Sequence, residues 1–96
     1  LTQVVEKGFK SVINNRPDME GGPDQPTSAQ IEEAARNQGL DYVYQPVVAG
    51  QITELDVRNS ANHYNELPKP ILMFCRTGNR SNNLYQLAKQ MDLLDD

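Results

Sequence analysis

The residues whose chemistry stands out lie in the stretch Phe74-Cys-Arg-Thr-Gly-Asn-Arg-Ser81, which holds the only cysteine of the chain. Residues 71–75 form an unbroken apolar run, and Cys75 ends it. A glycine-containing loop follows, and residues 81–91 then carry apolar side chains at helical spacing. A thiol is therefore expected at the carboxyl end of a buried strand, directly before a loop and the first turn of a helix.

This loop has the features of an anion cradle that would activate the thiol. Consecutive backbone N–H groups in such a loop form an anion-binding nest, and the start of the next helix adds partial positive charge. Arg80 adds a guanidinium that can bind an oxyanion through two hydrogen bonds. Gly78 permits a backbone turn that a side chain would obstruct. These effects favour the thiolate, so the sequence predicts a lowered pKa and a nucleophilic role for Cys75, against the alternative of an inert core thiol.

The other residues of the loop are assigned supporting roles. Thr77 and Asn79 are expected to act through their backbone N–H groups, whereas Ser81 can cap the helix and donate its hydroxyl to the sulfur. Arg76 either joins the anion site or faces solvent. The predicted catalytic residues are Cys75 and Arg80, and the predicted anion-binding loop contains Arg76, Thr77, Gly78, Asn79 and Ser81.

Alternating strand and helix patterns surround this loop. Strands are predicted for residues 10–14, 40–45 and 71–75, and helices for 1–7, from Thr27 or Ser28 to about Gln38, 54–67 and 81–91. Leu55 is expected on the apolar side of its helix. A strand that is apolar on both faces is typical of the middle of a parallel sheet, so residues 71–75 are expected there. The chain is predicted to be one α/β domain, residues 1–96, with a parallel sheet and helices on both faces.

The segments that follow the three predicted strands should meet at one edge of the sheet, where parallel α/β folds bind their ligands. These segments are residues 15–22, 46–51 and 75–80. Residues 15–26 contain two glycines and three prolines, which indicates a long loop of the kind that is often functional.

Polar side chains at the start of that long loop could serve the site. Asn14 and Asn15 are expected to hold the loop in place through side-chain hydrogen bonds. Arg16 leaves the first strand beside the site and could bind an anionic substrate. A salt bridge between Arg16 and Asp18 or Glu20 is an equally good interpretation.

Composition excludes several classes of protein. With 9 basic and 13 acidic residues among 96, the net charge of −4 argues against a nucleic-acid-binding face. No apolar run approaches the roughly 20 residues of a membrane span, and the N-terminus lacks the apolar core of a signal peptide. A single cysteine excludes an internal disulfide framework. With only one cysteine and one histidine in the chain, a structural zinc site is also disfavoured. The expectation is a cytoplasmic domain without metal or cofactor, and its start at Leu1 suggests a piece of a longer protein.

Residues 75–81 resemble the active loop of rhodanese-type sulfurtransferases and, more loosely, that of cysteine-dependent phosphatases. Together with Phe-Lys-Ser-Val-Ile-Asn-Asn-Arg-Pro at 9–17 and Gly-Leu-Asp-Tyr-Val-Tyr-Gln-Pro-Val at 39–47, they make nearly the whole chain similar to the phosphatase-like domain of beta-lactamase hydrolase-like proteins. The resemblance implies the dual-specificity phosphatase fold, with a short β segment upstream of Leu1 in the relatives. It also implies a partner, because in those proteins the domain is fused to, or encoded beside, a metallo-beta-lactamase-fold persulfide dioxygenase.

Two departures from the phosphatase pattern bear on the reaction. Such phosphatases have a His before the Cys and five residues between Cys and Arg, whereas here Phe74 precedes Cys75 and only four residues separate it from Arg80. A shorter loop suits a terminal sulfur atom better than a phosphoryl group. Phosphatases also place a general-acid Asp after the second strand, where residues 47–51 read Val-Val-Ala-Gly-Gln. The carboxylates that could substitute are Asp18, Glu20 and Asp24.

The sequence therefore predicts a rhodanese-type sulfurtransferase that forms a persulfide on Cys75 from thiosulfate or a low-molecular-weight persulfide. Sulfur transfer needs no strong general acid, because sulfite and thiolates leave readily. The first alternative is a cysteine-dependent tyrosine or dual-specificity phosphatase, a hydrolase that acts through a phosphocysteine. The second is a non-catalytic persulfide-sensing or docking module. The expected partners are a small sulfur-containing anion or persulfide and the dioxygenase, with no nucleic acid or membrane.

Overall fold

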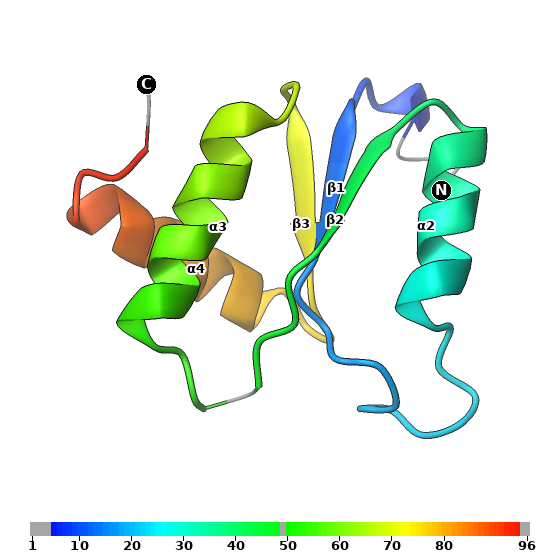
Figure 1. The fold of residues 1–96 in the computed structure, drawn as a ribbon, viewed down its shortest axis with the longest axis horizontal. Helices are drawn as coiled ribbons and strands as arrows, with labels where there is room; N and C mark the ends of the chain where they lie inside the picture. Colours follow the sequence, from blue (N-terminus) through cyan, green and yellow to red (C-terminus); the bar gives the residue numbers. More distant parts are fainter. Residues whose placement is uncertain (1–4, 49, 95–96) are drawn as a thin grey trace.

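The protein is a three-layer α/β domain in which a small parallel sheet separates two groups of helices (Figure 1). The computed structural model describes residues 5–48 and 50–94. In chain order the elements are β1 (Ser11–Asn14), α2 (Ser28–Asn37), β2 (Asp41–Tyr44), α3 (Glu54–Glu66), β3 (Ile71–Phe74) and α4 (Asn79–Gln90). The expected α/β class, with a parallel sheet and helices on both faces, is confirmed.

The sheet has the strand order β2-β1-β3, and both pairings are parallel. Ile13 of β1 lies opposite Val43 on one side and Met73 on the other. All four residues of β1 are buried, whereas all four of β3 are half-buried. The expectation that residues 71–75 form the middle strand was wrong, because β1 holds that position among the described strands. The apolar sequence of β3 reflects apolar neighbours on both faces, because Met73 packs against the α3/α4 cluster and Phe74 against the α2 cluster, and this does not require a strand on both of its edges.

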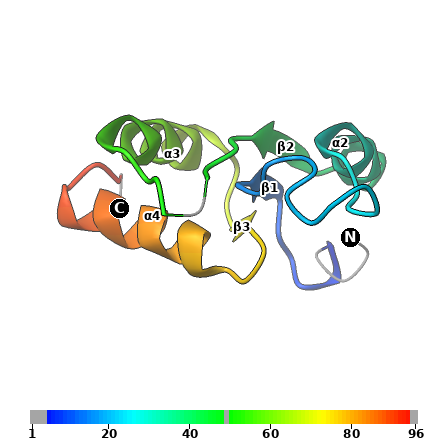
Figure 2. The ribbon, with the colours of Figure 1, turned by 90° about the horizontal axis from the view of Figure 1, so that it is seen from below.

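Each face of the sheet has its own apolar cluster. On one face α2 covers Val12 and Tyr42, joined by Ala35 and Leu40. On the other face α3 and α4 cover the sheet, and their cluster consists of Val47, Val57, Ala61, Leu84 and Ala88, with Met73 packed against it. Figure 2 shows α2 on one side of the strands and α3 with α4 on the other. Because successive side chains of a strand point to opposite faces, four-residue strands are enough to anchor both layers.

The helix starts follow two different rules. Thr27 before α2 and Thr53 before α3 each form a full capping box, in which the threonine oxygen accepts a backbone N–H and a side chain returns the bond. α4 begins instead after Gly78, a left-handed residue with φ 89° and no side-chain cap. The expectation that Ser81 caps this helix was wrong, because Ser81 lies inside its first turn. This leaves the first N–H groups of α4 available to the site.

Two further expectations are corrected or fall partly outside the described residues. Leu55 was expected on the buried side of its helix, but its side chain is 67% exposed, because the apolar face of α3 is set by Val57 and Ala61. In the predicted helix 1–7, residues 1–4 lie outside the described part of the chain. The turn that follows them closes where the Gly8 N–H donates to the Val5 carbonyl oxygen at 3.0 Å.

Candidate active site

Three segments meet at the carboxyl edge of the sheet, as the sequence predicts. They are the Asn15 loop (residues 15–26), the Gln45 segment (residues 45–48) and the Cys75 loop (residues 75–80). The Asn15 N–H donates to the Phe74 carbonyl oxygen at 2.8 Å, and the Val47 N–H donates to the Asn15 carbonyl oxygen at 3.0 Å. Backbone hydrogen bonds therefore continue beyond the strands and fix the three segments against one another.

The buried side chain of Asn15 ties the same segments together a second time. Its Nδ2 donates to the Gln45 carbonyl oxygen at 3.0 Å, and its Oδ1 accepts the Ser81 hydroxyl at 2.9 Å. Asn14 acts on its own loop, since its Oδ1 accepts the Arg16 N–H at 2.9 Å while its Nδ2 donates to the Tyr42 hydroxyl. The expectation that these two amides pin the loop is confirmed.

Cys75 lies at the bottom of the site, 8% exposed, and the Gly78 N–H donates to its sulfur at 3.1 Å. Burial raises the pKa of the Cys75 thiol. The backbone N–H groups of Ser81, Thr77 and Arg80, with the Ser81 hydroxyl, outweigh burial and hold that pKa below its ordinary value. The sulfur thus faces peptide dipoles rather than an apolar core, which is the environment of a reactive thiolate.

The guanidinium of Arg80 is already occupied by a carboxylate. Its Nη1 and Nη2 each donate to an oxygen of Glu20 at 2.6 Å, and Nη1 also donates to the Val47 carbonyl oxygen at 2.8 Å. Arg80 is only 9% exposed. Its pKa is raised by the Glu20 carboxylate first and also by nearby Cys75, against the opposing effect of burial. Arg80 therefore lies between the sulfur and Glu20, and it is not an open anion ligand in this arrangement.

Arg16 forms a salt bridge, the second of its two expected roles. Its Nε lies 3.4 Å from Oε1 of Glu20, too poorly aligned for a hydrogen bond. The Arg80 hydrogen bonds lower the pKa of the Glu20 carboxyl, and the charges of Arg80 and Arg16 add to this against the effect of burial. Glu20 is thus ionised at neutral pH and cannot serve as a proton donor there.

The other carboxylates of the Asn15 loop are not placed as general acids either. Asp18 accepts the Ser28 N–H at 2.7 Å and so supports the start of α2, while Asp24 is exposed. After β2, the described residues 45–48 and 50–52 include no carboxylate. Among residues 5–48 and 50–94, no group of three or more His, Cys, Asp or Glu side chains could hold a metal ion.

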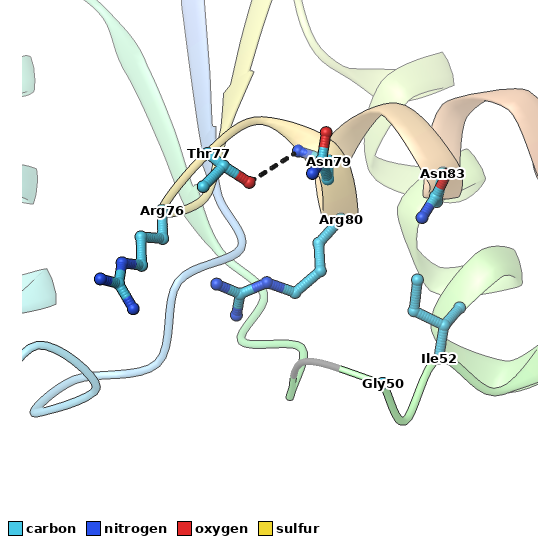
Figure 3. A pocket seen from close by; sticks show the side chains of 7 residues that line it. All are labelled: Gly50, Ile52, Arg76, Thr77, Asn79, Arg80 and Asn83. Carbon is cyan, nitrogen blue, oxygen red and sulfur yellow. Dashed lines mark hydrogen bonds between the residues drawn. The ribbon is translucent and has the colours of Figure 1, made fainter.

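A pocket of about 540 Å³ opens beside the Cys75 loop (Figure 3). Arg76 extends from the loop and Arg80 from the first turn of α4 at this pocket, and the remaining lining residues are Thr77, Asn79, Asn83, Gly50 and Ile52. Arg76 is exposed, and no hydrogen bond or ion pair ties its side chain within the described part of the chain. It is therefore the guanidinium best placed to meet an incoming anion.

The predicted loop residues come together as expected, with two differences in their roles. The Asn79 N–H points to the Thr77 hydroxyl at 3.4 Å, not to the sulfur. The Ser81 hydroxyl donates to Asn15 and also lies near enough to Cys75 to lower its pKa. The bidentate bond between Glu20 and Arg80 was not predicted from the sequence. The charges of the two residues were compatible, but they are 60 positions apart and no local spacing links them.

Comparisons with known proteins agree with this architecture. Residues 1–92 match the family described as "Beta-lactamase hydrolase-like protein, phosphatase-like domain". The chain is 41% identical over 86 residues to a beta-lactamase hydrolase-like protein of Agrobacterium fabrum and 36% identical to one of Xylella fastidiosa, and it spans about a fifth of the length of each.

A solved structure shows the same fold. It is that of a "putative phosphatase" of Neisseria meningitidis, which is 34% identical to this chain and superposes with a TM-score of 0.85. The match covers 92% of this chain and 62% of the other. These descriptions favour the phosphatase alternative over the sulfurtransferase prediction, and they name no substrate.

Proposed function

We propose that this chain, which belongs to the phosphatase-like domain family of beta-lactamase hydrolase-like proteins, is a sulfurtransferase that carries sulfane sulfur on Cys75. The observation that carries the proposal is an activated thiol beside which no general acid is placed among residues 5–48 and 50–94. Amide N–H groups lower the pKa of Cys75, while the carboxylate nearest to Arg80 is ionised. Such a site can start a nucleophilic attack but cannot protonate a poor leaving group.

In the first step the Cys75 thiolate attacks the outer sulfur of a donor. With thiosulfate, a new S–S bond forms to Cys75, and the bond between the two donor sulfurs breaks. Its electron pair leaves with sulfite. With an alkyl persulfide the leaving group is the corresponding thiolate. In both cases charge is conserved and no proton is needed, so a site without a general acid suffices.

In the second step a thiophilic acceptor attacks the outer sulfur of the Cys75 persulfide. The electron pair of the S–S bond returns to Cys75 and restores the thiolate. Between the two steps the terminal sulfur carries negative charge, and the Gly78 N–H and its neighbours lie where they can hold it. A loop with only four residues between Cys75 and Arg80 provides room for this small group.

Phosphatase activity is the second candidate, and the family description and the Neisseria structure favour it. A phosphatase would form a phosphocysteine on Cys75 and would need a proton for the leaving alkoxide. It would also need Arg80 to hold the phosphoryl oxygens, a position now filled by Glu20. Both requirements would demand a rearrangement that sulfur transfer does not.

The length of the relatives supports a role beside another domain. The chain spans about a fifth of the beta-lactamase hydrolase-like proteins it matches. We propose that its persulfide product passes to a fused or neighbouring persulfide dioxygenase of the metallo-beta-lactamase fold. A domain that only senses persulfide or docks to that partner would form the Cys75 adduct but would show no turnover.

A paired assay tests the proposal. Thiocyanate formation from thiosulfate and cyanide is measured beside phosphate release from an aryl phosphate, in the wild type and in Cys75→Ser. We expect thiocyanate formation that falls at least about 10³-fold in the variant, because the nucleophile is lost. Mass spectrometry should show one added sulfur atom on Cys75 after exposure to donor alone.

The possible outcomes separate the three functions. Phosphate release without thiocyanate would establish the phosphatase and overturn the proposal. An adduct on Cys75 without turnover, for thiosulfate and for an alkyl persulfide donor, would indicate a sensor. Thiocyanate formation that survives Cys75→Ser would remove the mechanism, provided that thermal unfolding shows both proteins to be folded.

A further inference from the structure

Glu20 occupies the place in which a substrate anion would meet Arg80. Its two oxygens take both Nη groups at 2.6 Å, the bidentate geometry with which an arginine binds an oxyanion. The side chain of Arg80 is 10% exposed and that of Glu20 is 21% exposed, so the guanidinium is largely shielded from water and the carboxylate lies nearer the surface. Two short hydrogen bonds hold the carboxylate against Arg80, so its charge belongs to the electrostatics of the site.

The Asn15 loop is built to hold Glu20 in that position. The Gln25 side chain bridges the loop, since its Nε2 donates to the Pro17 carbonyl oxygen at 2.9 Å and its Oε1 accepts the Gly21 N–H at 2.7 Å. Met19, directly before Glu20, adopts φ 66°, a conformation that costs a non-glycine residue free energy. These features indicate that the carboxylate is positioned, not merely attracted.

The net charge of the site follows from the groups linked through Arg80 and the Cys75 loop. The positive groups are the guanidinium groups of Arg16, Arg76 and Arg80, and the negative groups are the Glu20 carboxylate and the Cys75 thiolate. The net charge of the set is +1, whereas without Glu20 it would be +2. A site of this charge is balanced by a monoanion and would hold a dianion with an excess of negative charge.

We propose that Glu20 is a specificity-determining residue that tunes the Cys75 loop to sulfane donors with one negative charge at the reacting end, such as alkyl persulfides. Dianions, including thiosulfate, are disfavoured because Glu20 neutralises Arg80 and repels a second charge. This inference rests on the proposed sulfurtransferase function and narrows its donors. It assigns Glu20 a role in selection by charge, not in proton transfer.

The test measures kcat/KM for thiosulfate and for glutathione persulfide in two variants, one that removes a negative charge from the site and one that removes a positive charge. Glu20→Gln should raise the value for thiosulfate about tenfold while changing that for the persulfide less than about threefold. Arg16→Gln removes a positive charge and should lower the value for thiosulfate more than that for the persulfide. Glu32→Gln, which removes an exposed carboxylate paired with Arg36 on α2, is the matched control and should leave the ratio unchanged.

A binding measurement keeps this inference separate from the proposed function. In a Cys75→Ser background, sulfate affinity is measured by titration calorimetry with and without Glu20→Gln. Tighter sulfate binding in the double variant would uphold the selection by charge. If, at the same time, no protein that retains Cys75 transferred sulfur, the proposed sulfurtransferase function would be overturned while the role of Glu20 remained. Unchanged sulfate affinity, or an equal change in kcat/KM for both donors, would overturn the role of Glu20.

Discussion

The Cys75 loop and the Asn15 loop lie against each other, but one contributes mainly backbone groups to the site and the other mainly side chains. The Cys75 loop offers the sulfur its backbone, through the Gly78 N–H and the first N–H groups of α4. The Asn15 loop acts through side chains, namely the amide of Asn15 and the carboxylate of Glu20. One loop therefore depends on its conformation, and the other depends on the identity of particular residues.

The difference shows that backbone groups and side chains can have separate roles in a small active site. Backbone donors are held by the fold and do not depend on side-chain identity, which suits a nucleophile that must stay activated. Side chains set charge, which suits the choice of substrate. Substitutions in the Asn15 loop should accordingly alter stability and selectivity, while those at Gly78 in the Cys75 loop should act mainly through backbone strain.

Asn15→Leu should have the largest effect on stability. The substitution keeps a similar volume but leaves the buried Gln45 carbonyl without its partner and removes the amide oxygen that accepts the Ser81 hydroxyl. We expect the free energy of unfolding to fall by about 2 to 4 kcal/mol, measured by urea denaturation. A loss below about 1 kcal/mol would show that the amide does not hold the three segments together.

Arg80→Met should come next, because it leaves the Glu20 carboxylate without its main partner. The expected loss is about 2 kcal/mol, between the values for surface and buried pairs, because Arg80 is buried while Glu20 is exposed and keeps Arg16 beside it. The matched control is Arg36→Met, whose exposed pair with Glu32 should contribute less than about 0.5 kcal/mol. Equal losses in the two variants would place the Arg80 pair among ordinary surface ion pairs.

Gly78→Ala tests the backbone side of the comparison. Nothing lies within 4 Å of an added Cβ, so the cost comes from φ 89° alone. We expect a loss of about 1 to 2 kcal/mol, smaller than for Asn15→Leu. If the strained loop shifts, the N–H moves away from the sulfur, and the pH midpoint of Cys75 alkylation by iodoacetamide should rise. An unchanged midpoint and stability would argue against the loop geometry.

The smallest effect should appear as a dependence of stability on pH. In the folded protein, hydrogen bonds from Arg80 hold the pKa of the Glu20 carboxyl below its usual range, whereas in the unfolded chain this carboxyl has its usual pKa. As the pH falls from about 5 towards the lowered pKa, the unfolded state takes up the proton first, so this contribution to stability is lost. Glu20→Gln should therefore lose less stability than the wild type across that window in urea titrations. Parallel curves would contradict the pairing.

Local patterns predicted most of the fold and half of the site. Alternation of strands and helices, and a helix start at Thr27 or Ser28, can be predicted from a few residues of sequence, and the structure selects Thr27 as the cap. The strand order could not be, because the apolar pattern of β3 reports burial of its faces and not which strands flank it. The same limit explains why Cys75 was identified and the Glu20 bond was not. A loop that activates its own thiol is local, whereas a pair 60 positions apart depends on the tertiary structure.

The backbone of Asn15 has a further consequence for how the site opens. Its N–H is bonded to the β3 side and its carbonyl to the Gln45 segment, so neither neighbour can detach without breaking a bond to this one residue. Deuterium uptake at the Asn15 and Val47 amides should therefore proceed with a common rate, in a single cooperative fluctuation. Exchange at those two amides would therefore measure the local opening of the whole site, even though neither amide contacts the sulfur.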